Sequence, residues 1–225
     1  MTATPKSPWV LAGCGCLSFI LALILFVAAY FAGGSHMPNL TSGSSTDDTV
    51  VYRNTPEGRT GKLAENYTGF EFRYPKTWVL KPDPDAANFV TVERAVDGKT
   101  YENLNVGYFS TAGSTEKNQL LYLKLIAQFQ SQFEQQFHDL KKVGEGATKV
   151  GSYDGWEGLF TSTTGDDDKK VNVYTRVILL PNSDGTKGVT LLMMGTSLCP
   201  DLSAAEDLGK KGELPGVLDS FKFVE

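Results

Sequence analysis

Apolar and polar positions alternate along several short stretches after residue 65, which is the pattern of half-buried β-strands. In residues 70–74, three aromatic side chains alternate with Glu71 and Arg73. The same kind of pattern predicts further strands at 89–95, 103–109, 149–153, 156–163, 171–180 and 189–197. Asp97-Gly98 is a turn signal between the second and third strands. The last four strands follow one another with short connections, so we predict that they form an antiparallel meander.

Residues 115–140 carry the pattern of a helix, because large apolar side chains recur every three or four positions. These side chains are Tyr122, Ile126, Phe129, Phe133, Phe137 and Leu140. Ser114 or Thr115 is expected to cap the helix. We expect the phenylalanine-rich face to enter the core and the face rich in glutamine and lysine to face water. A second helical stretch is predicted at 202–211, broken by Pro215.

Strands, a long helix, a meander and a final helix predict an α+β domain in which helices cover an antiparallel sheet. We place this domain at residues 65–225. Residues 32–50 are rich in Gly, Ser, Thr and Pro and have almost no large apolar side chains. Such a composition buries too little surface to offset the entropy of ordering. We therefore assign residues 32–64 to a flexible linker.

Residues 9–31 contain no charged side chain and consist mainly of apolar residues. At about 1.5 Å per residue, a helix of this length spans the roughly 30 Å hydrocarbon core of a bilayer. We predict one transmembrane helix here, preceded by a tail at 1–8. Lys6 and the terminal amine precede the helix, and Asp47 and Asp48 follow it. The positive-inside rule then places the tail in the cytoplasm and the domain in the periplasm or outside the cell, at the cell (inner) membrane.

Leu11-Ala12-Gly13-Cys14 resembles the signal of bacterial lipoproteins, in which the cysteine is lipidated after cleavage. A cleavable signal carries its apolar stretch, about 7–15 residues long, before the cleavage point. Here the apolar run follows the motif. We therefore predict that the segment stays attached as an anchor.

Small side chains form a stripe along the predicted transmembrane helix, at spacings of three, four and seven residues. They are Ala12, Gly15, Ser18, Ala22 and Ala29. Such a stripe lets a second membrane helix pack closely, although small residues are also common in membrane helices that have no partner. We treat these residues as helix-packing candidates.

The charge and the cysteine content exclude several classes of protein. The chain has 21 Lys and Arg against 26 Asp and Glu, and its basic residues are scattered, which disfavours a nucleic-acid surface. Two of its three cysteines, Cys14 and Cys16, lie in the apolar segment, so no disulfide framework is possible and Cys199 is expected to be a buried structural thiol. The two histidines, His36 and His138, lie far apart in sequence, so a zinc or haem site is not expected.

Catalytic chemistry has few candidates in this sequence. His138 is expected to be a solvated residue near the end of the long helix. Asp166, Asp167 and Asp168 could bind calcium, but consecutive acids cannot all point at one ion, so a solvated hairpin tip is the favoured interpretation. The loop at 83–85 has the same interpretation. We therefore expect no catalytic residue, no cofactor and no metal site.

Three motifs resemble those of PsbP-like domains. Residues 69–78, GFEFRYPKTW, are similar to the family's first strand, which runs through an aromatic pair into a Tyr-Pro-x-x-Trp turn. Residues 153–158, YDGWEG, resemble the hairpin that begins the family's meander, and 218–222, LDSFK, resemble its Ser-Phe ending. The order of elements matches over residues 65–225.

This resemblance implies an α/β/α sandwich and relatives that are mostly non-enzymatic. They include extrinsic subunits of photosystem II, assembly factors for photosynthetic complexes, and Ran-binding nuclear-transport relatives that share the fold. The uncleaved anchor departs from the thylakoid-lumen members, which carry a transit peptide.

Two functions are consistent with these features. The first is a non-catalytic accessory or assembly subunit, whose domain docks on the extracytoplasmic face of a larger membrane protein complex, photosynthetic or electron-transferring. The second is a free-standing, membrane-tethered domain that binds or senses a small ligand or metal, with a pocket between the sheet and the aromatic helix.

Overall fold

A computed structural model describes residues 48–81, 88–113, 115–165, 170–182 and 184–224. The first half of its elements are β1 (Thr49–Asn54), α2 (Gly61–Glu65), β2 (Phe70–Pro75), β3 (Val79–Lys81), β4 (Val90–Val96), β5 (Lys99–Ser110) and α3 (Thr115–Glu134). The second half are β6 (His138–Val150), β7 (Tyr153–Thr164), β8 (Val171–Pro181), β9 (Lys187–Thr196), the 3-10 helix η3 (Ala205–Asp207), α4 (Leu214–Asp219) and β10 (Lys222–Phe223).

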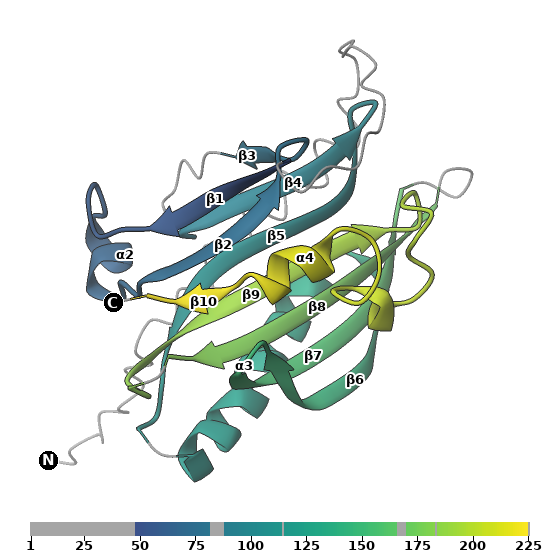
Figure 1. The fold of residues 1–225 in the computed structure, drawn as a ribbon. Helices are drawn as coiled ribbons and strands as arrows, with labels where there is room; N and C mark the ends of the chain where they lie inside the picture. The colour runs from purple at the N-terminus through teal and green to yellow at the C-terminus, as the bar shows by residue number, and fades with distance from the viewer. Residues whose placement is uncertain (1–47, 82–87, 114, 166–169, 183, 225) are drawn as a thin grey trace, which may run out of the picture.

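The described strands form two antiparallel sheets. The large sheet has the order β3-β4-β5-β9-β8-β7-β6, and the small sheet has the order β1-β2-β10. In Figure 1 the small sheet and α4 lie over one face of the large sheet, while α3 lies on the other face. The predicted meander of four antiparallel strands is confirmed as β6 to β9.

The core between the two sheets is built from the alternating strand that the sequence predicts at residues 70–74. Phe70 and Phe72 on β2 are buried, whereas Arg73 is exposed. The Phe70 ring stacks on Phe221, with 5.6 Å between centroids. Ser220 joins the same two segments, because its Oγ accepts a hydrogen bond from the Arg73 backbone N–H at 2.8 Å. The first and the last of the three PsbP-like motifs, residues 69–78 and 218–222, therefore contact each other at β2.

The second core lies between α3 and the large sheet. Ile126 and Phe129 on α3 are fully buried, and Phe133 meets Phe160 of β7 edge to face at 5.5 Å. A methyl group on Gly158 would lie 2.8 Å from Ile126 Cγ2, so this glycine allows the helix to approach β7 closely. The prediction that the phenylalanine face enters the core is confirmed.

The long helix ends earlier than predicted. It stops at Glu134, and residues from His138 onward form β6. Phe137 and Leu140 continue the helical spacing in the sequence, and both contact the same core as α3. They reach this core from a turn and a strand, which is why periodicity alone misplaced the boundary.

Two turns differ in how well the sequence located them. Asp97 and Gly98 join β4 to β5 with positive φ of 50° and 73°, as a type I′ hairpin requires. The predicted strands at 149–153 and 156–163 place a break at Asp154-Gly155, and this break is wrong, because both residues lie inside β7. The turn instead uses Gly151, with φ of 56°.

The layer on the face of the large sheet opposite α3 differs from the helical layer expected for the predicted α/β/α sandwich. It consists mainly of the small sheet, with α4 beside it. β1 pairs with β2 from Thr49 to Asn54, and Leu63 of α2 is buried. The folded part of the chain therefore includes residues 49–64, which composition alone had placed in the predicted linker. The strand β2, which carries Phe70, Phe72 and Tyr74, pairs with β1. The composition of residues 49–54 does not predict this pairing.

The predicted helix at 202–211 is reduced to η3. The Asp207 carboxylate accepts hydrogen bonds from the Ser203 N–H at 2.9 Å and from the Ser203 hydroxyl at 2.8 Å, which holds the segment in a loop. The Lys211 ammonium and these Ser203 donors hold the pKa of Asp207 well below its usual range. Pro215 lies in the first turn of α4, where its missing N–H costs nothing.

The predicted transmembrane helix at 9–31 lies outside the described residues, as do Cys14 and the stripe formed by Ala12, Gly15, Ser18, Ala22 and Ala29. Among the described residues, no helix has the length and apolar content needed to span a bilayer.

Candidate functional site

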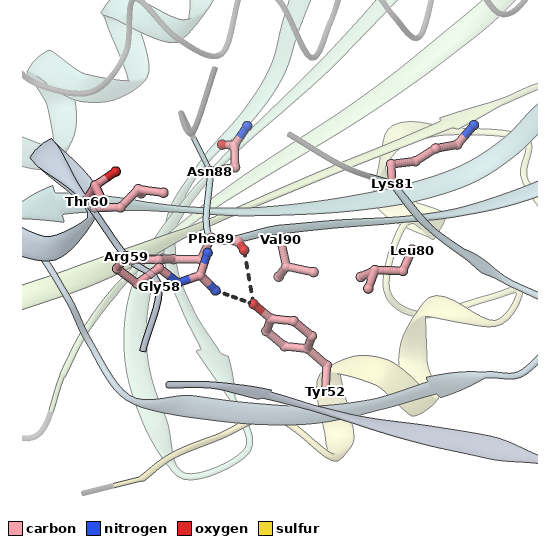
Figure 2. Close-up of a pocket in the computed structure, with 10 residues that line it drawn as sticks. Tyr52, Gly58, Arg59, Thr60, Leu80, Lys81, Asn88, Phe89 and Val90 are labelled. Atoms are coloured by element: carbon pink, nitrogen blue, oxygen red, sulfur yellow. Dashed lines mark hydrogen bonds between the residues drawn. The ribbon is translucent and has the colours of Figure 1, made fainter. Parts of the chain in front are cut away.

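A pocket of about 390 Å³ opens where an edge of the small sheet meets an edge of the large one. Figure 2 shows it between β1, the turn that follows β1, and the strands β3 and β4. Its lining consists of Tyr52, Gly58, Arg59, Thr60, Leu63, Leu80, Lys81, Asn88, Phe89 and Val90. Among the described residues, the lining contains two cations and no carboxylate.

Arg59 is held in place by three neighbours. Its Nη2 donates to the Tyr52 hydroxyl at 2.8 Å and to Asn54 Oδ1 at 2.7 Å. Asn54 is itself fixed, because its Nδ2 donates to the Thr68 carbonyl at 2.7 Å. The guanidinium lies 5.7 Å from the centre of the Phe89 ring, a distance typical of a cation–π contact. The side chain is therefore oriented before any ligand arrives.

The charge of Arg59 has no partner of opposite sign among the described residues. Arg53, Arg94 and Arg176 each lie within 3.0 Å of a carboxylate oxygen, but Arg59 does not. Its Nε is buried and has no hydrogen-bond acceptor in the described structure. A buried donor without an acceptor costs about 1–3 kcal/mol. The pocket thus contains a donor that an added acceptor could satisfy.

The Tyr52 hydroxyl is fully engaged. It accepts a hydrogen bond from Arg59 and donates to the Phe89 carbonyl at 3.0 Å, and Figure 2 draws both bonds. Burial raises the pKa of Tyr52, and the positive charge of Arg59 opposes this effect only in part. Because the hydroxyl stays protonated at neutral pH and its proton is used, the pocket offers a fixed cation and no proton-transfer group at this position.

Lys81 stands at the other end of the pocket from Arg59 (Figure 2). Its ammonium lies 3.5 Å from Glu93 Oε1, so Lys81 has a carboxylate partner. Leu80, Phe89 and Val90 form apolar walls between the two cations. The pocket therefore combines apolar surface with one positive charge that has no carboxylate partner in the described part of the chain.

A second polar cluster lies beneath the turn after β2 and serves the fold. Trp78 Nε1 donates to Glu213 Oε2 at 2.6 Å, and Arg94 bridges Glu213 at 3.3 Å and Glu102 at 3.0 Å. Burial raises the pKa of Glu102, and the hydrogen bond from Arg94 opposes this shift. This network joins β4 and β5 to the segment before α4. The tryptophan of the Tyr-Pro-x-x-Trp motif is thus a structural residue.

Two of the residues singled out in the sequence, His138 and Cys199, do not line the pocket. His138 is exposed at the start of β6. Cys199 is fully buried, as predicted, and burial raises the pKa of its thiol. The loops at 83–85 and 166–168 lie outside the described residues. Where the structure describes the chain, no three His, Cys, Asp or Glu residues gather as metal ligands.

The interface between α3 and the sheet, where a ligand pocket was predicted, is filled by side chains such as Phe129 and Phe160. A hollow of about 330 Å³ lies at its margin, beside Tyr122 and Trp156. Arg59 was missed because it lies in a turn within the assigned linker. A lone arginine between Gly58 and Thr60 carries no sequence signal of its own.

Comparison with known proteins identifies the fold. No protein-family model matches the chain, and no curated protein matches its sequence. The structure is similar to the solution structure of cyanobacterial PsbP (CyanoP) from Synechocystis sp. PCC 6803, with 14% identity and a TM-score of 0.51, over 83% of this chain and 98% of that one. LpqN of Mycobacterium tuberculosis, described as involved in cell envelope biogenesis, matches with 11% identity and a TM-score of 0.44, over 80% of this chain and 93% of that one. The described part of this chain therefore has a PsbP-like fold.

Proposed function

We propose that this chain is a non-catalytic accessory protein, anchored by residues 9–31, whose PsbP-like domain binds a larger membrane protein complex on the extracytoplasmic side. The observation that carries the proposal is the pocket around Arg59, an oriented cation at the surface with no carboxylate partner among the residues that the structure describes. A photosynthetic or electron-transfer complex is the class of partner that the PsbP-like fold favours.

The surroundings of the pocket support a protein partner. β1 and β3 are edge strands of their sheets, and they carry exposed apolar side chains. These are Val50, Val51, Val79 and Leu80, with exposed fractions of 37%, 50%, 44% and 49%. Apolar residues gathered on edge strands are typical of an interaction surface.

Purification of the tagged full chain from its own cells in a mild detergent, after chemical cross-linking, tests this proposal. Mass spectrometry should recover a membrane complex, with cross-links concentrated on β1, β3 and the turn between β1 and α2. Recovery of the protein alone at stoichiometric yield would contradict the proposal.

A small ligand is the second candidate, because about 390 Å³ falls within the usual size range of ligand pockets. A thermal-shift screen of the full chain with metal ions and small metabolites separates the two functions. A ligand of the pocket raises the unfolding temperature as saturation increases, and Arg59→Gln should abolish that shift. A screen without any shift would leave the docking function as the better supported one.

A further inference from the structure

We infer that the Arg59 pocket receives a carboxylate side chain from an acidic, leucine-flanked segment of the partner protein. This inference rests on the proposed function and names the chemistry of contact. Arg59 offers a buried Nε without an acceptor, and it is held by Tyr52 and Asn54 rather than by an acid. An incoming carboxylate supplies the acceptor and the opposite charge in one step.

The charge of the pocket selects a carboxylate over a phosphate. The whole chain has a formal net charge of −5, whereas the charged side chains that line the pocket, Arg59 and Lys81, are both positive. Of its two cations, Lys81 already lies near Glu93. In the described structure one positive charge, that of Arg59, remains without a carboxylate partner, and it matches a group with a single negative charge better than a group with two.

The apolar residues around the pocket select a peptide over a free carboxylate ion. A single ion pair near the surface contributes little affinity. Leu80 lines the pocket and is 49% exposed, and Val50 lies two positions before Tyr52 on the same face of β1. Aliphatic side chains on both sides of the carboxylate would cover these residues, so binding requires a segment rather than an ion.

Fluorescence anisotropy with the full chain in a mild detergent tests the inference. The probe is a labelled, acetylated and amidated Gly-Leu-Glu-Leu-Gly peptide, compared with the same peptide carrying Gln in place of Glu. The Glu peptide should bind at least about tenfold more tightly, as expected for a charge-assisted hydrogen bond. This advantage should shrink between 0.1 and 1 M salt, because the Debye length falls from about 10 to about 3 Å.

Three variants assign the effect to the pocket. Arg59→Gln should remove the advantage of the Glu peptide. Thr60→Glu should do the same, because it places a carboxylate on the pocket wall without removing a hydrogen bond of Arg59. Arg53→Gln is the matched control, since Arg53 lies on β1 and pairs with Glu71 outside the pocket, and it should keep the advantage. Thermal unfolding of each variant verifies that it is folded.

Two results would overturn the inference. One is equal binding of the Glu and Gln peptides by the folded wild-type chain. The other is displacement of the Glu peptide by inorganic phosphate more than tenfold better than by acetate, which would assign the pocket to a phosphate group. In either case a complex recovered by cross-linking would still support the accessory function through another surface, so the two failures are distinguishable.

Discussion

The close approach of α3 to β7 can be tested by adding and removing single methyl groups. Gly158 lies beneath Ile126, and a Cβ on this glycine would stand 2.8 Å from Ile126 Cγ2 and 3.0 Å from Cδ1. These distances are shorter than ordinary contacts between carbon atoms, which lie near 3.5–4.0 Å. Gly158→Ala therefore forces the helix, the strand or the isoleucine side chain to move.

The size of the effect follows from two opposing terms. Overpacking a well-filled core costs about 1–3 kcal/mol, while replacing glycine by alanine in a strand regains about 0.5–1 kcal/mol of conformational entropy. Gly158→Ala should thus lower the free energy of unfolding by about 0.5–2 kcal/mol. Ile126 is fully buried, so Ile126→Ala should lower it by about 2–5 kcal/mol.

The combination of the two substitutions should change the sign of the glycine effect. In the Ile126→Ala background the two isoleucine atoms nearest the new methyl group are gone, while the Phe160 ring, with its Cε2 at 3.2 Å, remains. The entropic gain is then opposed only by this weaker contact, so the double variant should be more stable than Ile126→Ala alone by up to about 1 kcal/mol, with a coupling energy of about 0.5–3 kcal/mol.

Urea denaturation of the full chain in detergent, followed by tryptophan fluorescence, measures all four free energies. Gly146→Ala is the matched control, because Gly146 lies in β6 and a methyl group there would meet nothing within 4 Å. It should have the same effect with and without Ile126→Ala. If Gly158→Ala destabilises both backgrounds equally, α3 does not pack on β7 at this glycine and the described interface is wrong.

Three further substitutions test the polar clusters by urea denaturation. Burial raises the pKa of Glu102 above its ordinary 4.5 despite the hydrogen bond from Arg94. The folded state therefore binds the proton more tightly than the unfolded state, and the free energy of unfolding falls as the pH rises above about 4.5. Glu102→Gln should flatten this pH dependence, and an unchanged pH dependence would refute the assignment to Glu102. Trp78→Phe removes the indole bond to Glu213, which is about a third exposed, and should cost about 1.5 kcal/mol; a neutral result would show that the bond does not stabilise the fold. Asp207 has a lowered pKa, so it stabilises the fold above about pH 3.8 and loses this contribution as the pH falls; Asp207→Asn should destabilise at pH 7, and the deficit should shrink in acid.

Local patterns predicted β2 well because this strand has one buried face and one polar face: the buried Phe70 and Phe72 alternate with Glu71 and Arg73. β5, β8 and β9 are instead buried along nearly their whole length, and their apolar runs still located them. The turn at Asp97 and Gly98 was predictable because its positive φ values restrict the residue types. A two-residue periodicity and a turn signal are both contained within a few neighbouring positions.

The elements that were missed depend on contacts between distant segments. β1 was assigned to a linker, yet Tyr52 and Asn54 gain their positions by pairing with β2 and by bonds to Phe89 and Thr68. The early end of α3 at Glu134 is equally non-local, since Phe137 reaches the helical core from a turn that precedes a strand.

The candidate site could not have been predicted from the sequence for the same reason. Arg59 becomes a site residue only when the turn after β1 meets the strands β3 and β4. What distinguishes it from the paired Arg53 and Arg94 is the absence of a nearby carboxylate among the described residues, and this is a property of the folded chain.

The small sheet also determines when the domain can fold during synthesis. Its central strand β2 pairs with β1, which the ribosome makes earlier, and with β10, which it makes some 150 residues later along the printed sequence. Phe70 therefore cannot stack on Phe221 until the end of the chain has been synthesised. Until residues 214–223 have been made, the apolar face of the large sheet lacks part of its cover and is open to chaperones and to aggregation. Closure of this domain is thus a late, long-range step, and a ribosome that stalls before α4 would release a chain with an exposed core.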